Sequence, residues 1–571
     1  MPPRRIDPVK PVVTIPASLL PSATEEPIPS TITSVLTAPE FRDLQPFFCA
    51  QESFRTTPIR PSHSWMGSTQ IDSFTRDESN PLFASLGLKS GETVPIFLKR
   101  IHILDPLRAV EGDYAWNSSA GLPTLRDQAK ETFEKIHQPL NEAYVDALFA
   151  LCANQMVATK TSPHWCQCFG TMTGRVQKYL YNITDELDEF ERSSWWKPHQ
   201  RMGLFRVVVE DEEEEFQTGS SVSQSARRVL GEATSLVGDE FEEVGYVSSA
   251  SSSDEEEEIV AGDGGDTISE PSIALSVPRV RLKRLSDDSS ETSTTTSEEG
   301  PQTFAEFPDF PVQITLLERA DGTMDELLEA DEIVEAEWTA WIFQVIAALT
   351  SAQKIYGFVH NDLHTNNIMW SATTKEHLIY KVQKAAGGTF YMKVPTFGKI
   401  MKIIDFGRAS FTLPREHGGF YISDAFFKGN DAADQYNCAP FYDPDDGPKV
   451  EPNPSFDLCR LSVSLIEALY PTRPEPVKPI KVMYREGAKI YTETESPLYN
   501  LLWGWLVDKS GKNVLRSADG RERYPDFDLY KAIASDVKNA IPFRQIEQPL
   551  FASYRLETPP PPGFQVYDLF I

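Results

Sequence analysis

Two short polar motifs in the second half of the chain combine residue types that can carry out group transfer. The first has the pattern His-x-Asp-x-x-x-x-Asn, formed by His360, Asp362 and Asn367, and the second is an Asp-Phe-Gly that begins at Asp405 after an apolar run. In phosphoryl transfer from ATP, one carboxylate accepts the proton of the attacking hydroxyl, and further carboxylate and amide oxygens hold Mg²⁺. Asp362 is suited to the first role, and Asn367 and Asp405 are suited to the second. Both motifs in this order, joined by strand-like sequence, are a specific signal for this chemistry.

The stretch from His360 to Asn367 and the Asp-Phe-Gly after it resemble the protein-kinase superfamily, and they are most similar to the divergent kinases of large double-stranded DNA viruses. The resemblance covers roughly residues 55–545. It implies the α+β class and a two-lobed protein-kinase-like fold, with a small antiparallel β lobe that has one helix and a larger, mainly α-helical lobe. It also implies an ATP- and Mg²⁺-dependent protein kinase that transfers the γ-phosphate to serine or threonine of protein substrates.

Composition sets apart residues 1–40 and 546–571, and the resemblance divides the rest into residues 41–317 and 318–545. The first is a proline-rich arm, expected to be disordered or draped over the body, and the last is a proline-rich tail, expected to dock on the body or on a partner. Between them lie the expected small lobe and then the hinge with the large lobe. Residues 210–300 carry 24 acidic and 6 basic residues. Such a segment buries too little apolar surface to fold, so this insertion in the small lobe is predicted to be disordered.

A lysine near the end of an apolar run is the candidate for binding the ATP phosphates. Residues 80–87 and 93–101 are two apolar runs around a turn with Gly91, which predicts a hairpin. Lys99 lies in the second run, and the resemblance implies that it binds phosphate. The Gly-x-Gly-x-x-Gly loop that kinases normally have before this strand is absent, and Gly67 is a candidate only from far upstream. Nucleotide binding is therefore weakened, or another backbone turn cradles the phosphates.

Apolar residues recur at helical spacing between Pro139 and Lys160. The resemblance implies that this helix supplies an acidic partner for the phosphate-binding lysine. Glu142 is the first choice, and Asp146, one turn later, is the alternative.

An apolar strand that begins at Pro311 runs through Leu317 into Glu318, Ala320 and a glycine, which resembles the hinge between the two lobes of a kinase. The resemblance implies that the backbone groups of Glu318 and Ala320 bind the edge of adenine. It also implies that Leu317 guards the pocket behind the nucleotide.

Three elements are expected to support the loop with the first motif. A long apolar helix at 335–354 leads into it, and strand-like runs at 377–384 and 389–396 predict an additional hairpin after it. Asp457 opens a further apolar helix. The resemblance implies that Asp457 bonds the backbone of the loop and that His360 braces Asp405.

One residue departs from the family pattern and keeps two alternatives open. Many protein kinases have a lysine two residues after the catalytic aspartate, whereas this chain has His364. A neutral imidazole offers the transferring phosphate a donor but no fixed charge. Histidine at this place also occurs in small-molecule kinases of the same fold, which are the first alternative. The second is a pseudokinase scaffold, favoured by the missing glycine loop, that binds partners through its acidic insertion and its tails.

The overall composition limits partners and location. A net charge of −30 argues against direct binding of nucleic acid or of an anionic membrane. No apolar run approaches the ~20 residues of a membrane helix, and the six cysteines include no Cys-x-x-Cys pair, which favours reduced thiols. A soluble, cytoplasmic protein is expected. The resemblance extends this to the host cytoplasm or the virion, with virion or host proteins as partners of the disordered segments beside ATP and the protein substrates.

Overall fold

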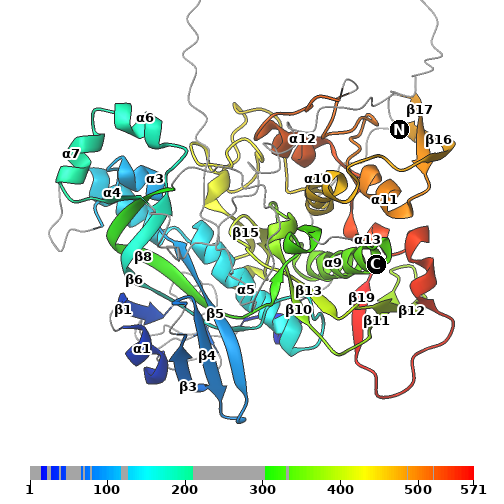
Figure 1. Ribbon diagram of the computed structural model, residues 1–571, viewed down its shortest axis with the longest axis horizontal. Coiled ribbons are helices and arrows are strands. Elements are labelled where there is room, and N and C mark those ends of the chain that lie inside the picture. Colours follow the sequence, from blue (N-terminus) through cyan, green and yellow to red (C-terminus); the bar gives the residue numbers. More distant parts are fainter. Residues whose placement is uncertain are drawn as a thin grey trace, which may run out of the picture.

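The computed structural model describes residues 15–21, 28–37, 40–46, 66–67, 71–77, 80–116, 127–209, 302–329, 333–484, 487–517 and 520–571. The acidic insertion predicted at 210–300 lies outside these residues, as does most of the N-terminal arm. The described residues form a mixed α+β structure. In Figure 1 a large antiparallel sheet lies at the left, helices α9 to α11 lie at the right, and α5 lies between them.

The large sheet has eight strands, six of them in the order β1-β6-β8-β5-β4-β3, while β2 pairs with β6 and β7 pairs with β8. All pairs in it are antiparallel. Its strands are β1 (Phe41–Pro46), β2 (Met66–Gly67), β3 (Ile71–Arg76), β4 (Phe83–Leu88), β5 (Thr93–His102), β6 (Cys168–Asn182), β7 (Arg206–Val209) and β8 (Thr303–Glu318). The hairpin predicted from two apolar runs is confirmed, because β4 pairs with β5 around the left-handed Gly91.

The described helices occur in both halves of the chain. They are α1 (Ser30–Leu36), α3 (Pro106–Val110), α4 (Asp127–His137), α5 (Glu142–Ala158), α6 (Leu187–Arg192), α7 (Trp196–Arg201), α9 (Glu335–Tyr356), α10 (Phe456–Leu469), α11 (Pro497–Trp505), α12 (Asp528–Asp536) and α13 (Pro542–Gln545). The predicted helices around 139–160 and 335–354 are confirmed as α5 and α9. Both are buried on nearly all sides, as expected for helices without a polar face. No helix in the described part of the chain is long and apolar enough to cross a bilayer.

Four small sheets accompany the second half of the chain. Their strands are β9 (Gly322–Thr323), β10 (Ile368–Ala372), β11 (His377–Gln383), β12 (Thr389–Pro395), β13 (Lys399–Ile403), β14 (Ser410–Thr412), β15 (Phe420–Ile422), β16 (Pro476–Tyr484), β17 (Gly487–Thr494), β18 (Arg555–Leu556) and β19 (Val566–Phe570). The additional hairpin is confirmed, since β11 and β12 pair along their whole length. Short 3-10 turns complete the chain at Ala17–Leu19, Glu326–Glu329, Thr365–Asn367, Arg415–His417, Asp424–Phe426 and Pro549–Tyr554.

Two pieces of the N-terminal arm pack against the body. For these pieces, the second of the two expectations, an arm draped over the body, is the one observed. Ile32 and Leu36 of α1 are fully buried in the apolar core of the large sheet. Leu19 is buried in the main core, where its carbonyl accepts a hydrogen bond of 2.6 Å from the hydroxyl of Tyr356. Residues 15–21 and 28–37 are therefore ordered.

The C-terminal tail docks on the body. Strand β19 pairs in parallel with β11, beside which it lies in Figure 1, and the sheet order becomes β18-β12-β11-β19. Tyr567 and Leu569 alternate inward from β19 and are 6% and 1% exposed. The tail thus completes a core that includes α9.

Because β19 is docked, substitutions at neighbouring residues of the tail should differ clearly in their effect on the free energy of unfolding. Leu569→Ala should lower the free energy of unfolding by about 2–5 kcal/mol, because it removes a buried side chain and leaves a cavity. Phe570→Ala is the matched control, since Phe570 is 39% exposed, and it should cost about 0.5 kcal/mol. Urea unfolding followed by tryptophan fluorescence measures both. Equal losses in the two variants would contradict the docked arrangement.

Candidate functional site

The register of two strands brings the two sequence motifs together. Strands β10 and β13 are antiparallel, with Ile368 opposite Ile403. Asn367 directly precedes β10 and Asp405 closely follows β13, so the two residues meet at one end of the pair. A hydrogen bond of 3.0 Å from the Ile404 amide to the Asn367 carbonyl closes this end. Strands β10 to β13 therefore lie between the two motifs in the sequence, while the residues of the two motifs are neighbours in space.

The backbone around both motifs is held in an uncommon conformation. Asn361 and Asp405 each have φ of 66°, in the left-handed region, which asparagine and aspartate adopt more readily than other residues with a side chain. The buried carboxylate of Asp457, on α10, accepts hydrogen bonds of 3.0 Å from the backbone amides of His360 and Asn361. His360 in turn contacts the Ile404 carbonyl through Nε2 at 2.8 Å. Burial raises the pKa of Asp457 to about 6, while the two amides and His360 oppose the shift.

Lys99 of β5 forms a buried ion-pair network. Its Nζ lies 2.6 Å from Oδ1 of Asp146 on α5 and 3.0 Å from Oδ1 of Asp405. The same Asp146 oxygen accepts the Phe406 amide at 2.7 Å. One carboxylate therefore ties the sheet, α5 and the Asp-Phe-Gly segment together. Burial lowers the pKa of Lys99, but Asp146 and Asp405 outweigh it and the pKa is raised, so the lysine is charged.

Glu142 does not pair with Lys99, which corrects the first choice made from the sequence. Its side chain lies against Gly407, where a Cβ would stand 2.9 Å from the Glu142 Cγ. Burial raises the pKa of Glu142 to about 8, with Arg408 opposing and Asp431 and Asp405 reinforcing the shift. The alternative, Asp146, occupies the expected position one turn further along α5.

The N-terminus of α5 is fixed by a residue of the segment that follows Asp-Phe-Gly. Asp424 accepts the Glu142 amide at 3.1 Å and the Lys135 ammonium at 2.7 Å, and its own amide donates to the Leu140 carbonyl at 2.7 Å. A carboxylate at a helix N-terminus is favoured by the unpaired amides and the helix dipole. Asp424 thus holds α5 at its first turn, and the Lys99 partner follows one turn later.

Asp362 is 3% exposed, and side chains from helices α10 and α12 hold it in position. The hydroxyl of Tyr530, on α12, donates to its Oδ1 at 2.9 Å, and this hydroxyl accepts a hydrogen bond of 2.9 Å from Nε of Arg460 on α10. On the other side, Nη1 of Arg408 lies 3.8 Å from Oδ2. Burial raises the pKa of Asp362, but Arg408, Arg460 and the Tyr530 hydrogen bond outweigh it, and the pKa is lowered. Asp362 is therefore a carboxylate at neutral pH.

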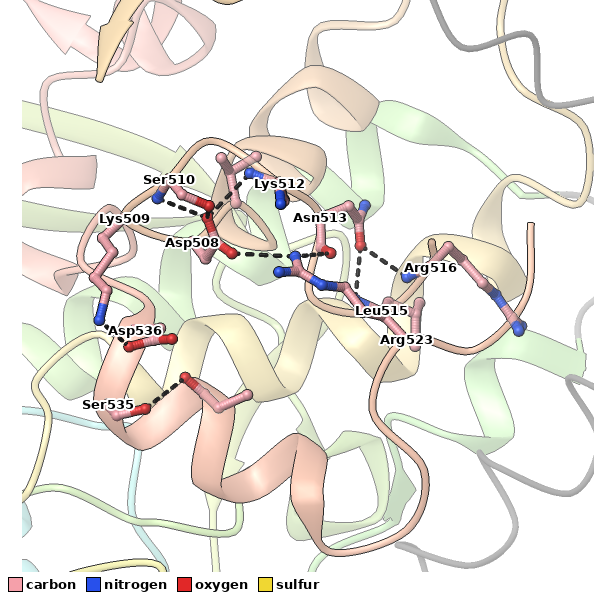
Figure 2. A network of polar contacts seen from close by, with 12 residues as sticks. Asp508, Lys509, Ser510, Lys512, Asn513, Leu515, Arg516, Arg523, Ser535 and Asp536 are labelled. Atoms are coloured by element: carbon pink, nitrogen blue, oxygen red, sulfur yellow. Dashed lines mark hydrogen bonds and ion pairs between the residues drawn. The ribbon is translucent and has the colours of Figure 1, made fainter. Parts of the chain in front are cut away.

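The loop before α12 is built by its own polar contacts, which Figure 2 shows. The Asp508 carboxylate accepts the amides of Ser510 and Lys512 at 2.7 and 3.0 Å, and it pairs with Arg523 at 3.1 Å. From the same loop, Lys509 binds Asp536 at the C-terminal end of α12 at 2.5 Å. These contacts tie the loop to the C-terminal end of α12, the helix that carries Tyr530. Tyr530 was not predicted as a site residue, because no local signal in the sequence marks it.

Asn367 and Asp405 offer oxygen ligands that suit Mg²⁺. The Nδ2 of Asn367 donates to the Asp362 carbonyl at 2.9 Å, which orients the amide and directs its Oδ1 elsewhere. Lys99 occupies one oxygen of Asp405, and the second remains for a metal. Among the described residues no group of three or more His, Cys, Asp or Glu could hold a metal ion. The pair fits Mg²⁺, which is commonly bound by one or two protein oxygens together with substrate phosphates.

His364 lies beside this pair and is neutral. Its Nε2 is 3.0 Å from Nδ2 of Asn367, a donor, so Nε2 must accept and the proton is on Nδ1. Burial lowers its pKa to about 3, although Asp362 opposes the shift.

The predicted hinge residues lie where β8 ends. Leu317 is 8% exposed and pairs with Phe97 of β5. The amide of Glu318 donates to the Gln167 carbonyl at 2.8 Å, and its carboxylate binds the ammonium of Lys402 at 2.9 Å. Ala320 follows and is also buried. The adenine contacts assigned to these residues stay a prediction.

Gly67 is not near Lys99. It pairs with Gly170 of β6, whereas β5 is separated from β6 by β8. The turn that connects β3 to β4, before the Lys99 strand, contains no glycine between Arg76 and Phe83. Its described ends are tied by a hydrogen bond of 3.0 Å from the Asp77 amide to the Phe83 carbonyl. Any phosphate cradle in this turn would have to use other backbone donors.

No family model matches the chain. Over 112 residues it is 32% identical to a probable serine/threonine-protein kinase of Dictyostelium discoideum, and this stretch is 19% of the chain and 9% of that protein. The chain thus spans about a tenth of the length of the curated relative that it matches. This distant and partial similarity points to a kinase-like function.

Proposed function

We propose that the protein is an ATP- and Mg²⁺-dependent protein kinase that transfers the γ-phosphate to serine or threonine hydroxyls. The observation that carries the proposal is the convergence of Lys99, Asp362, Asn367 and Asp405 from separate parts of the chain. A buried lysine, two oxygen ligands and a charged carboxylate in one place are the groups that phosphoryl transfer requires. The strand order around β5 and the helix α5 that pairs with its lysine support a two-lobed kinase-like fold.

In this mechanism each residue has one task. Lys99, held by Asp146, binds phosphate oxygens of ATP. Asn367 and Asp405 would hold Mg²⁺, which would supply charge neutralisation at the ATP phosphates. Asp362 orients the acceptor hydroxyl through its carboxylate and takes the hydroxyl proton. Asp457 and Tyr530 keep the loop and the carboxylate in position, so that little reorganisation is needed during the reaction.

A protein acceptor is favoured by the segment between Gly407 and Lys449. It follows the site directly, contains the β14–β15 hairpin and exposes side chains such as Tyr442, which is 45% exposed. A polypeptide can lie along such a segment. A small-molecule acceptor is the second candidate, because His364 stands where many protein kinases have a charged lysine.

Nucleotide binding is the first test. Millimolar ATP with Mg²⁺ should raise the unfolding temperature, because a ligand at 100 times its Kd stabilises the native state by about 2.7 kcal/mol. Chelation of the metal with EDTA should remove most of the shift, and Asp405→Asn should show the same loss with the metal present. Differential scanning fluorimetry measures all four conditions. No shift at millimolar nucleotide would favour a pseudokinase scaffold.

The acceptor is the second test. The purified protein is incubated with γ-labelled ATP and Mg²⁺ and with a panel of proteins, sugars, choline and nucleosides. We expect label on serine or threonine of proteins, identified by phosphoamino-acid analysis. Label on a small molecule alone would replace the protein-kinase assignment with a small-molecule kinase.

A further inference from the structure

Phosphoryl transfer is accelerated by a fixed positive charge where the migrating group passes between donor and acceptor. This inference deepens the proposed function, on which it rests, and concerns which side chain supplies that charge. In the described part of the site, the cations near Asp362 and Asp405 are Lys99, Arg460 and Arg408, and the imidazole of His364 lies against Asn367.

The charged groups of Lys99 and Arg460 are already engaged in contacts with other side chains. Lys99 lies within 3.0 Å of the carboxylates of Asp146 and Asp405. Arg460 is 1% exposed and donates to Tyr530 through Nε and to Ser464 through Nη1, both at 2.9 Å. Its side chain therefore lies behind Asp362, on the α10 side, and does not face the reacting groups.

His364 cannot supply the charge in this arrangement. Its Nε2 must accept from Nδ2 of Asn367, which lies 3.0 Å away. The same Nδ2 donates to the Asp362 carbonyl at 2.9 Å, so the amide cannot be turned to present its oxygen instead. A lysine at this position would have no such constraint.

Arg408 is different because part of its guanidinium is unused. Nη1 lies 3.8 Å from Oδ2 of Asp362, beyond hydrogen-bond distance. Nε is buried and has no hydrogen-bond partner among the described residues. The main chain of Arg408 is nevertheless fixed, since its carbonyl accepts Nδ2 of Asn361 at 2.8 Å. A held backbone with a charged, incompletely bonded side chain is suited to bind an anion that is present only during turnover.

We propose that Arg408 binds the oxygens of the transferring phosphoryl group and replaces the charge that His364 lacks. In the step it assists, the acceptor oxygen forms a bond to the γ-phosphorus and the bond from that phosphorus to the bridging oxygen breaks. The electron pair of the broken bond leaves with ADP, and the acceptor proton moves to Asp362. Guanidinium donors stabilise the charge spread over the migrating group, and this interaction is stronger in the transition state than with ATP.

The test compares Arg408→Gln and Arg408→Lys with the wild-type protein. Arg408→Gln should lower kcat by about 10²–10³, the usual effect of removing one charge-stabilising donor, and change the KM for ATP by less than about threefold. Arg408→Lys keeps the charge and should lose less. Arg415→Gln, an exposed arginine in the same segment, is the matched control and should behave as wild type.

A binding measurement separates charge stabilisation from a structural role. Titration calorimetry with ADP, Mg²⁺ and aluminium fluoride, a mimic of the transferring phosphoryl, should show weaker binding by Arg408→Gln than by wild type. Binding of ADP with Mg²⁺ alone should be unchanged. Equal weakening of both ligands, or of neither, would overturn the proposal.

The charge can also be moved to the other residue. His364→Lys in the Arg408→Gln background should restore at least about tenfold of the lost kcat, because it returns a cation to the neighbourhood of Asp362. Absence of restoration in a double variant that still binds ADP would overturn the role of Arg408. The proposed function fails by a different result, namely wild-type protein that binds no ATP or transfers no phosphate.

Discussion

Asp362→Asn should lower phosphate transfer by about 10²–10⁴, the contribution usual for a positioned proton acceptor. The substitution changes charge and little else. The hydroxyl of Tyr530, 2.9 Å from Oδ1, can still donate to the amide oxygen. The Asp457 contacts to the loop amides do not involve Asp362. Because the lowered pKa keeps Asp362 ionised at neutral pH, the variant removes a negative charge that the wild-type protein has throughout its working range.

The measurement is initial-rate incorporation of labelled phosphate, with thermal unfolding of each variant as the test of folding. The KM for ATP should stay within about threefold, since Lys99, Asn367 and Asp405 are left intact. Asp188→Asn is the matched control, because its side chain on α6 is 87% exposed. Wild-type rates in Asp362→Asn would rule out Asp362 as proton acceptor and, with it, the proposed mechanism.

Much of the candidate site could be read from the sequence because its residues lie in short motifs. The two motifs flank β10 and β13, and a strand pair needs only apolar runs and a register to bring its ends together. The hairpin β4–β5 follows from two apolar runs around a glycine turn, and the helix α5 follows from periodicity. The Lys99 strand, the helix and both motifs were therefore predictable without any long-range contact.

The residue that pairs with Lys99 could not be predicted from the sequence pattern. Glu142 and Asp146 lie one turn apart on α5, so helical periodicity places both on the same face. Which of them meets Lys99 depends on how far α5 extends along the sheet, and Asp424 fixes this from a segment more than 280 residues away in the chain. Sequence periodicity carries no information about that position along the helix axis.

The supports of Asp362 were not predictable for a related reason. Tyr530 and Asp362 are 168 residues apart and belong to elements with no common motif. The one available signal was Arg460, a charged residue in the middle of the apolar sequence of α10. A buried arginine requires partners, because an unpaired charge is costly in the interior. This signal predicts that a buried acceptor exists, but not which residue supplies it.

Asp146→Asn should be the most damaging substitution on α5. It leaves Lys99, 3% exposed, with Asp405 as its remaining carboxylate. Breaking one side of a buried ion pair costs about 3–5 kcal/mol. Lys99 would then bind Asp405 more closely, and that carboxylate would be less able to serve the metal. We expect kcat to fall by about 10²–10³, with a raised KM for ATP.

Glu142→Gln provides the sharp comparison, because it makes the same chemical change one turn away. With a pKa raised to about 8, Glu142 is largely protonated at neutral pH, and glutamine has nearly the shape and the charge of that form. Its activity should therefore stay within about threefold of wild type. Steady-state kinetics at a temperature well below both unfolding transitions measures the two variants side by side. If Glu142→Gln were the more damaging one, α5 would sit one turn further along the sheet during catalysis, and Glu142 would then be the residue that pairs with Lys99.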